Sequence, residues 1–250
     1  MSTHLVIDKL SVDFNGFKAI TDLTLNINKG ELRCLIGPNG AGKTTAMDLI
    51  CGKTKPTSGS ILYDGIELAH MEEYQIARLG VGRKFQVPSV FKQLTVRENL
   101  EVARCKYVGV FTNVVRSGHS IMTDKIDNLV EFVGLQNELE KPAAFLSHGQ
   151  TQWLEIALLL AQDSELILLD EPTAGMTNQE TFKTAEICNR LKGDHTLIVV
   201  EHDMGFVREI GDVISVMHQG SLLAEGSAIE VSNNEKVKEV YLGSIGIDYA

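Results

Sequence analysis

The segment Gly37-Pro38-Asn39-Gly40-Ala41-Gly42-Lys43-Thr44 is the most informative part of this chain. It fits GxxxxGK[ST], the pattern of a phosphate-binding loop. It lies between a strand-like run with the apolar residues Leu32, Cys34, Leu35 and Ile36, and a helix-compatible run, Thr45 to Cys51. Its glycines let successive N–H groups point at an anion, and the following helix adds positive charge at its N-terminus. We expect Lys43 to reach the β- and γ-phosphates and the Thr44 hydroxyl to bind Mg²⁺. The segment therefore predicts a site for a nucleoside triphosphate with Mg²⁺.

Two strand ends downstream carry the polar groups that such a site needs. Leu166 to Leu169 is an apolar run typical of a buried parallel strand, and it ends in Asp170 and Glu171. Asp170 is suited to hold Mg²⁺ through water, and Glu171 to orient or deprotonate the water that attacks the γ-phosphate. A second buried run, Thr196 to Val200, leads to His202, which such an edge would place near the γ-phosphate.

Composition narrows the class of protein. The 250 residues suffice for one large α/β domain with an inserted subdomain, and the formal net charge of −10 argues against nonspecific nucleic-acid binding. No apolar run approaches the ~18 residues that span a bilayer, and no signal-peptide core follows Met1, so we expect a soluble, cytosolic chain. Without CxxC spacing, the cysteines are expected to be buried, reduced thiols: Cys34, Cys51, Cys105 and Cys188.

The pattern becomes helical between residues 87 and 162, which we interpret as an inserted subdomain. Thr95 to Glu98 forms a capping box, and Thr123 to Val133 is an amphipathic helix that stops at Gly134. A last helix begins at Leu146-Ser147-His148-Gly149-Gln150, where Ser147 and Gln150 have capping-box spacing. The free N–H groups at that N-terminus predict a second anion site, separate from the phosphate loop.

The remaining segments favour an antiparallel layer, a final hairpin and a helical tail. Phe14, between the first two strands, could stack on a purine ring or simply pack in the core or a turn. The expected elements are strands at Leu5 to Val12, Leu23 to Ile27 and Ser60 to Tyr63, turns at Lys29-Gly30, Lys55 to Gly59 and Asp64-Gly65, a hairpin of Val213 to Met217 and Leu222 to Ala224 around Gln219-Gly220, and a helix from Ala228 to Tyr241.

Taken together, GPNGAGKT, Gln86, LSHGQ, LILLDEPT and a strand-ending EHD resemble, in this order, an ABC-transporter ATP-binding subunit over essentially the whole chain. The resemblance implies an α/β fold: one ABC nucleotide-binding domain over residues 1–250. Its P-loop NTPase core and antiparallel β subdomain would comprise residues 1–86 and 163–250, and its inserted α-helical subdomain residues 87–162.

The resemblance also implies a role for each site residue. Phe14 would stack on adenine, Gln86 would sense Mg²⁺ and the transmembrane partner, Asp170 would be the acid of the second nucleotide motif, Glu171 the catalytic base and His202 the switch histidine. The implied nucleotide-binding residues are Gly37, Pro38, Asn39, Gly40, Ala41, Gly42, Lys43, Thr44 and Thr45, with Ser147, Gly149 and Gln150 forming the signature. Two positions depart from the family pattern: His148 replaces the first glycine of LSGGQ, and Ala174-Gly175-Met176-Thr177 lacks the family's frequent Asp.

The implied function is to power a membrane importer by hydrolysing ATP with Mg²⁺. LSHGQTQWLEI, AGMT, VVEHDMGFVR, HQGSLLAEG and VKEVYLG are most similar to the urea importer group, related to branched-chain amino-acid importers; an amide importer is also open. Implied partners are a second ATP-binding subunit, transmembrane permease subunits and, indirectly, a periplasmic or surface solute-binding protein, but no nucleic acid. The chain itself would be a peripheral subunit at the cytoplasmic face of the membrane. Val87, Val90 and Phe91 would receive the membrane subunit or pack internally. A soluble ABC ATPase acting on ribosomes or DNA, and a phosphotransferase or GTPase, are the competing hypotheses.

Overall fold

The computed structural model describes residues 2–84, 90–104 and 119–244, and these divide into two compact units. The first unit comprises Met1–Arg83, Glu165–Pro172 and Cys188–Ala250, and the second comprises Lys84–Ser164 and Thr173–Ile187. The segment Thr173–Ile187, which the sequence analysis assigned to the core, thus lies in the second unit. A hydrogen bond of 3.0 Å from Trp153 Nε1 to Thr184 Oγ1 helps to hold it there.

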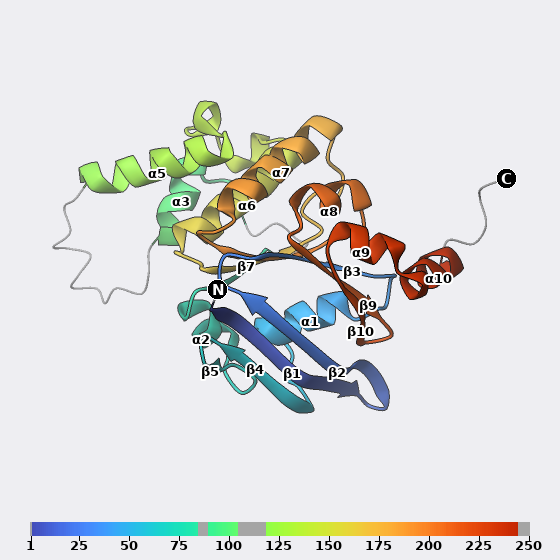
Figure 1. Cartoon of the computed structure of the whole chain (residues 1–250). Helices are drawn as coiled ribbons and strands as arrows, with labels where there is room; N and C mark the ends of the chain where they lie inside the picture. The colour runs from blue at the N-terminus through green and yellow to red at the C-terminus, as the bar shows by residue number, and fades with distance from the viewer. Residues whose placement is uncertain (1, 85–89, 105–118, 245–250) are drawn as a thin grey trace. The chain divides into compact units, whose positions relative to one another are not determined.

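A six-stranded, mainly parallel sheet carries the strand ends of the predicted site (Figure 1). Its β3, β7 and β8 are buried along their whole length, as their mainly apolar sequences predicted. Strands β3, β7 and β8 run parallel, β9 is parallel to β3, and β10 returns antiparallel to β9. The order is β10-β9-β3-β8-β7-β6, with β3 at Leu32–Ile36, β6 at Val81–Lys84, β7 at Leu166–Asp170, β8 at Thr196–Val200, β9 at Val213–His218 and β10 at Ser221–Gly226.

The predicted antiparallel layer is a separate sheet of the first unit, in the order β2-β1-β4-β5. Its strands β1 and β2 are longer than expected because they continue to a tight turn at Asn15-Gly16, where both residues have positive φ (53° and 95°). Asparagine followed by glycine favours this hairpin turn, and the predicted Asp64-Gly65 turn is of the same kind. The strands are β1 at Thr3–Phe14, β2 at Phe17–Asn28, β4 at Ser58–Tyr63 and β5 at Ile66–Glu67.

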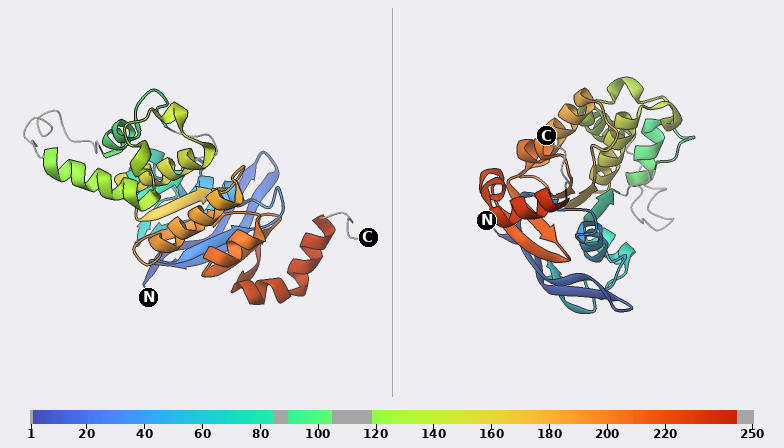
Figure 2. Two further views of the ribbon diagram at one scale, coloured as in Figure 1. Left: turned by 90° about the horizontal axis from the view of Figure 1, so that it is seen from above. Right: turned by 90° about the vertical axis from the view of Figure 1, so that its right-hand side faces the viewer.

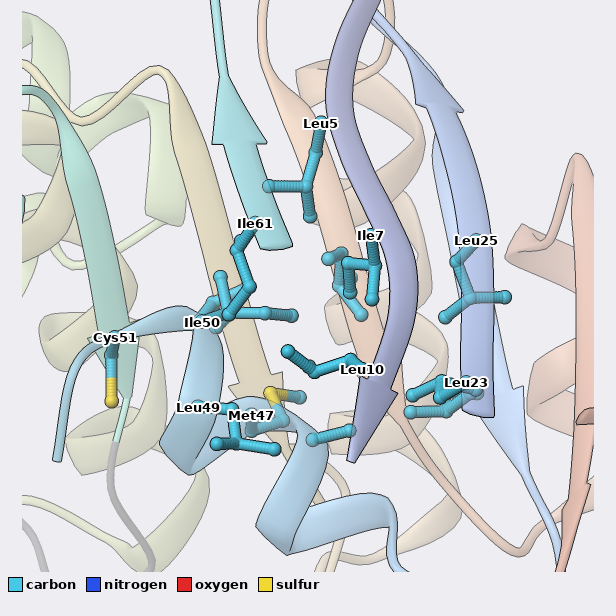
Figure 3. Close-up of a cluster of buried hydrophobic side chains, with 14 of the residues drawn as sticks. Leu5, Ile7, Leu10, Leu23, Leu25, Met47, Leu49, Ile50, Cys51 and Ile61 are labelled. Carbon is cyan, nitrogen blue, oxygen red and sulfur yellow. The ribbon is translucent and has the colours of Figure 1, made fainter. Parts of the chain in front are cut away.

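Helix α1, Lys43–Ile50, packs in the hydrophobic core that the two sheets share (Figure 3). Its Met47, Leu49 and Ile50 are buried in one cluster with Leu5 and Ile7 of β1 and with side chains of β7 and β8. Removing this apolar surface from water is the main free-energy gain of the unit. The packing also fixes the N-terminus of α1, where the phosphate loop ends.

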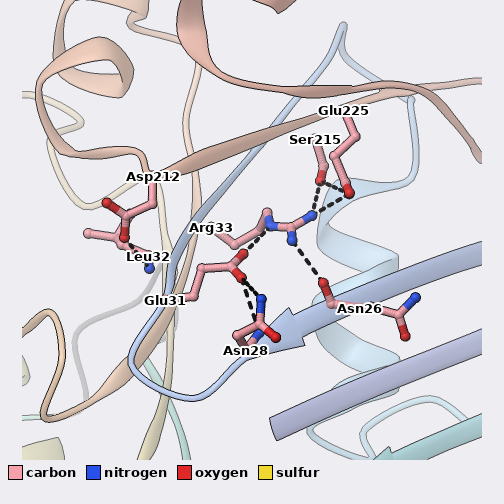
Figure 4. Close-up of polar contacts among 8 residues, drawn as sticks. All are labelled: Asn26, Asn28, Glu31, Leu32, Arg33, Asp212, Ser215 and Glu225. Carbon is pink, nitrogen blue, oxygen red and sulfur yellow. Dashed lines mark hydrogen bonds and ion pairs between the residues drawn. The ribbon is translucent and has the colours of Figure 1, made fainter. Parts of the chain in front are cut away.

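A buried polar network around Arg33 joins four strands of the first unit (Figure 4). The guanidinium donates to Glu31 Oε1 (2.7 Å), Ser215 Oγ (2.8 Å) and the Asn26 carbonyl (2.8 Å), and it also pairs with Glu225. Arg33 is only 2% exposed, and two carboxylates balance its charge. The network links β2 of the antiparallel layer to β3, β9 and β10 of the six-stranded sheet. Breaking it would leave a buried charge uncompensated, which is costly.

The tail of the chain is helical as predicted, but it forms two helices rather than one. Helix α9, Ala228–Asn233, ends at Asn234, whose backbone is extended and whose side chain accepts the Lys236 N–H at 3.0 Å. Helix α10, Glu235–Ser244, then runs in a different direction from α9, as Figure 2 shows. Two further helices of the first unit, which the sequence analysis did not predict, are α2 at Glu73–Arg78 and α8 at Met204–Ile210.

The second unit is a cluster of helices in which α3 and α5 contact α6. Both predicted capping boxes are confirmed: Thr95 with Glu98 before α3, and Ser147 with Gln150 at the start of α6. Helix α5 begins before Thr123 but ends at Gly134 as expected, where φ is +72°. The helices are α3 at Val96–Arg104, α5 at His119–Val133, α6 at His148–Ala161 and α7 at Asn178–Leu191, whose last residues belong to the first unit.

The cysteines are as predicted within the part of the chain that the structure describes. Cys34, Cys51 and Cys188 are free and buried. Burial raises the pKa of the Cys34 and Cys188 thiols to about 12, so both stay protonated at neutral pH. Cys105 lies outside the described residues.

Candidate nucleotide site

The phosphate loop joins β3 to α1 and depends on its glycines for shape. A Cβ on Gly37 would lie 2.2 Å from the Met217 carbonyl oxygen, and one on Gly42 would lie 2.7 Å from Ile20 Cδ1. A Cβ on Gly40 would meet no atom within 4 Å. Gly42, with φ of 99°, caps α1 without any side-chain hydrogen bond. The loop therefore packs closely on one side, and its other side leaves room for an anion at the uncapped helix N-terminus.

Lys43 lies partly buried against the loop that precedes it. Its Nζ donates to the carbonyl oxygens of Gly37 (2.7 Å) and Pro38 (3.1 Å). Burial lowers the pKa of Lys43, while the negative charges of Glu171 and Asp170 oppose that shift. The two predicted carboxylates are thus close enough to act on the ammonium group, as a shared site requires.

Asp170 is the last residue of β7, and its side chain is 1% exposed. Its Oδ2 lies 3.2 Å from Arg83 Nη2, whereas its Oδ1 has no hydrogen-bond partner among the described residues. A buried carboxylate oxygen left unpaired is costly, so a ligand that binds it is stabilised. A hard cation or its water suits this oxygen, and with the exposed Thr44 hydroxyl the donor set fits Mg²⁺.

Arg83 is a site residue that the sequence analysis missed. Its side chain is 4% exposed, and it reaches Asp48 of α1 as well as Asp170 of β7, with Cys51 Sγ at 3.4 Å. Burial opposes the charged form, but hydrogen bonds to Cys51 and Asp48 outweigh it and raise the pKa of Arg83. An arginine within a short buried strand was the available signal, because such a residue needs carboxylate partners.

Glu171 and His202 come together at the carboxyl ends of β7 and β8. Glu171 leaves the strand with a φ of +47°, and its N–H donates to the Val200 carbonyl at 2.9 Å. His202 Nδ1 lies 3.9 Å from Glu171 Oε1 and 3.8 Å from Glu201 Oε2, and the ring is 69% exposed. Both side chains can therefore meet a water or phosphate from the open side of this edge.

The aromatic and membrane-facing candidates are only partly described. Phe14 is 47% exposed and faces Phe17, 68% exposed, at the end of the β1–β2 hairpin, so either ring is accessible for stacking. Phe91 is 57% exposed, and its N–H donates to Asn99 Oδ1 at 2.8 Å. Gln86 and Val87 lie outside the described residues.

In the second unit, the N-terminus of α6 already holds an anion, the carboxylate of Glu180. Ser147 caps the helix and donates its hydroxyl to Glu180 Oε1 at 3.1 Å, and Thr177 binds Oε2 through its N–H and hydroxyl, each at 3.0 Å. These Thr177 bonds, with those of Ser147 and the Gly149 N–H, lower the pKa of Glu180. A Cβ on Gly149 would lie 2.5 Å from Glu180 Oε1, so glycine is what permits the contact. Thr177 and Glu180 have capping-box spacing, which could have indicated the start of α7 but not this contact.

His148, which departs from the family signature, contacts the other departing segment. Its Nε2 lies 2.9 Å from the Ala174 carbonyl oxygen and 3.4 Å from Gln152 Nε2. The histidine and the segment after β7 therefore support one another within the second unit.

A buried strand, a glycine-rich loop and a helix N-terminus, with carboxylates at the ends of neighbouring parallel strands, define a P-loop nucleoside-triphosphate-binding fold. A model of the family described as ABC transporter matches residues 20–174, and one described as branched-chain amino acid ATP-binding cassette transporter matches residues 221–245. The chain belongs to the ABC transporter family, and it is an ABC ATPase.

Relatives of this chain cover nearly its whole length. It is 37% identical over 248 residues to the high-affinity branched-chain amino acid transport ATP-binding protein LivG of Escherichia coli K12, covering 96% of this chain and 97% of LivG. BraF of Pseudomonas aeruginosa, named for the same transport, is 34% identical with the same coverage. The crystal structure of MJ1267 in its ADP conformation, an ATP-binding cassette of an ABC transporter, has a TM-score of 0.86 and 28% identity, covering 97% of this chain and all of MJ1267.

Proposed function

We propose that this chain is the ATP-hydrolysing subunit of a membrane importer whose solute is a branched-chain amino acid. One observation supports the proposed ATP hydrolysis: Asp170 has a buried, unpaired carboxylate oxygen, and its charge and that of Glu171 act on Lys43. The solute is proposed from the names of relatives that match along the whole chain.

In this proposal each site residue has a separate task. The loop N–H groups and Lys43 bind the phosphates, Thr44 and Asp170, with Gln86, hold Mg²⁺, and Glu171 accepts a proton from the attacking water. His202 lies near enough to Glu171 to orient the same water. Mg²⁺ itself would neutralise charge that develops on the phosphate oxygens.

The signature residues Ser147, Gly149 and Gln150 belong to the second unit, whereas the phosphate loop belongs to the first. We propose that hydrolysis needs a two-fold dimer with a second ATP-binding subunit, in which each signature completes the partner's pocket. The γ-phosphate would then hold the dimer closed, and its loss would let the subunits part.

We further propose that the chain works at the cytoplasmic face of a membrane, with permease subunits and, through them, a solute-binding protein. Among the described residues no helix combines the length and the apolar character needed to cross a bilayer. The exposed Phe91, with Val90 and Val87, is our candidate for the surface that receives a permease helix.

The choice of solute differs from the first expectation. Five short segments favoured the urea importer group, but the relatives and the second matching model are named for branched-chain amino acids. We therefore propose branched-chain amino acids as the solute and keep urea as the alternative.

Solute uptake by cells that lack this gene tests both the ATP-hydrolysing function and the choice of solute. We expect loss of labelled leucine uptake, restored by the wild-type gene but not by Lys43→Ala, with urea uptake unchanged. Loss of urea uptake alone would overturn the amino-acid assignment and support urea. Restoration by Lys43→Ala would contradict the motor function.

A further inference from the structure

Three side chains with metal-binding groups meet at a place that shares no residue with the nucleotide site. His4 lies in β1, Asp64 in the β4–β5 turn and Glu165 directly before β7, and one ligand atom of each lies within 4.8 Å of the others. Backbone hydrogen bonds fix their segments: Asp64 N–H to the His4 carbonyl, and Thr196 N–H to the Glu165 carbonyl, each at 2.9 Å. The grouping is therefore built by three separate parts of the first unit.

The His4 imidazole is buried and held at only one of its nitrogens. Its side chain is 0% exposed, its Nδ1 lies 2.5 Å from Thr196 Oγ1, and the ring packs 4.7 Å from that of Tyr63. The Nε2 atom has no hydrogen-bond partner among the described residues and lies 3.5 Å from Asp64 Oδ2. Burial lowers the pKa of His4, and the nearby charge of Asp64 opposes that shift.

The hydroxyl of Thr196 allows the tautomer that a metal ligand needs. This oxygen accepts the Gly30 N–H at 3.0 Å, and its second lone pair can accept a hydrogen bond from the N–H at His4 Nδ1. In this tautomer the lone pair of Nε2 lies near two carboxylates, and a bound cation would offset the repulsion among them. Metal-ligating histidines are usually fixed by a hydrogen bond that their other ring nitrogen donates, and Thr196 would be the acceptor here.

Lys29 supplies the positive charge at this place in the metal-free protein. Its Nζ lies 2.9 Å from Glu165 Oε2, and the side chain is half-exposed. A long, flexible lysine on the surface can swing into solvent at little cost, since exposed ion pairs are weak. It therefore competes with a cation for Glu165 without blocking the site.

We propose that His4, Asp64 and Glu165 bind a divalent transition-metal ion of the Zn²⁺ type. One imidazole nitrogen and two carboxylate oxygens form a ligand set that Zn²⁺ accepts, and the exposed Asp64 and Glu165 side chains leave a solvent side where water completes the coordination. Such an ion would join β1, the β4–β5 turn and the start of β7, so its binding stabilises the folded chain.

Calorimetric titration of the full-length, tag-free and nucleotide-free chain with ZnCl₂ tests the site. We expect one equivalent to bind, with at least ~10-fold weaker affinity in Asp64→Asn and in Glu165→Gln, since each removes a charged ligand. Asparagine tolerates the positive φ of 46° at position 64, so the turn is kept. Lys29→Met should bind several-fold more tightly because it removes the competing charge.

His70→Gln is the matched control, because it changes an exposed histidine outside the cluster. Its affinity for Zn²⁺ should equal that of the wild type, and a Zn²⁺-dependent rise in melting temperature should follow the same order among the variants. Absence of binding to the wild type below ~1 mM, or unchanged affinity in the Asp64→Asn, Glu165→Gln double variant, would overturn the site.

Discussion

Helices α1 and α6 begin in opposite ways, although both offer free N–H groups to an anion. Helix α1 follows Gly42 without a side-chain cap, and its first residue, Lys43, supplies a positive charge at this end. Helix α6 begins with a complete capping box at Ser147, and the carboxylate of Glu180 accepts bonds from the same terminus. The first terminus is thus prepared for an external anion, whereas the second already has an internal one.

This difference sets how the two sites can contribute to ATP binding. A phosphate at α1 gains the N–H groups and the ammonium charge directly. A phosphate at α6 must share or displace the bonds that Glu180 makes, and it meets a negative charge there. We infer that α1 supplies the affinity for nucleotide, while α6 contributes only when a partner subunit brings a γ-phosphate to it.

Replacing Lys43 with Ala removes the positive charge at the N-terminus of α1 and should affect ATP hydrolysis more than any change at α6. The variant lacks the charge that neutralises the β- and γ-phosphates, so ATP hydrolysis should fall by at least ~10³-fold. Phosphate release with ATP and Mg²⁺ measures it. Lys236→Ala, at an exposed lysine of α10, should keep wild-type activity. Near-normal hydrolysis by Lys43→Ala would contradict the site.

Glu171→Gln tests whether the two anion sites meet across a dimer. The amide cannot accept the proton of the attacking water, so hydrolysis should fall by about 10²-fold or more while ATP still binds. Light scattering should show a dimer with ATP and Mg²⁺ and a monomer without them. A variant that stays monomeric at saturating ATP, beside wild-type activity strictly proportional to protein concentration, would show that the sites do not combine.

The sequence predicted the α1 side of this comparison far better than the α6 side. The loop, the strand before it, and Asp170 with Glu171 follow from local patterns: glycine spacing, apolar runs and the polar residues at their ends. Glu180 was missed because its bonds to Ser147 and Gly149 join residues about 30 positions apart, and no local period reports such a pair. Arg83 was missed for the same reason, since Asp48 and Asp170 lie far from it in the sequence.

Local sequence patterns also failed to predict some helix boundaries. The tail reads as one helix because its polar and apolar residues keep a helical period, yet the Asn234 side chain caps a new helix within it. Helices α2 and α8 were not predicted because 6 and 7 residues are too few to show a helical period. Helix α7, with 14 residues, was not predicted either.

Glu180→Gln removes the internal charge from the N-terminus of α6 while keeping the shape of the side chain. In the Glu171→Gln background we expect the dimer to form at ~3- to 10-fold lower ATP concentration, because the phosphate no longer meets a carboxylate. Glu186→Gln, an exposed change on the same helix, should leave the dimerisation curve unchanged. A shift to higher ATP would show that Glu180 assists the closed state rather than competing with phosphate.

The charge of Glu180 also has a pH dependence with a definite sign. Because its pKa is lowered on folding, its stabilising bonds are fully present above the unfolded-state pKa and are lost as pH falls through the folded-state pKa. The wild type should therefore lose this part of its stability on acidification, and Glu180→Gln should not. Melting temperatures between about pH 3 and 6 measure the difference. Parallel curves for the two proteins would contradict the lowered pKa.

His148→Gly should have only a small effect on stability, and it tests whether the departure from the family signature is structural. The change removes the hydrogen bond from Nε2 to the Ala174 carbonyl and loosens the first turn of α6. We expect a loss of about 1 kcal/mol of stability, seen as a melting temperature ~2–4 °C lower. His148→Gln can still donate to that carbonyl and should recover part of the loss. Because the ring binds a backbone carbonyl and not Glu180, ATP-dependent dimerisation should change less than ~3-fold. A larger change in dimerisation with an unaltered melting temperature would instead place His148 in contact with the nucleotide.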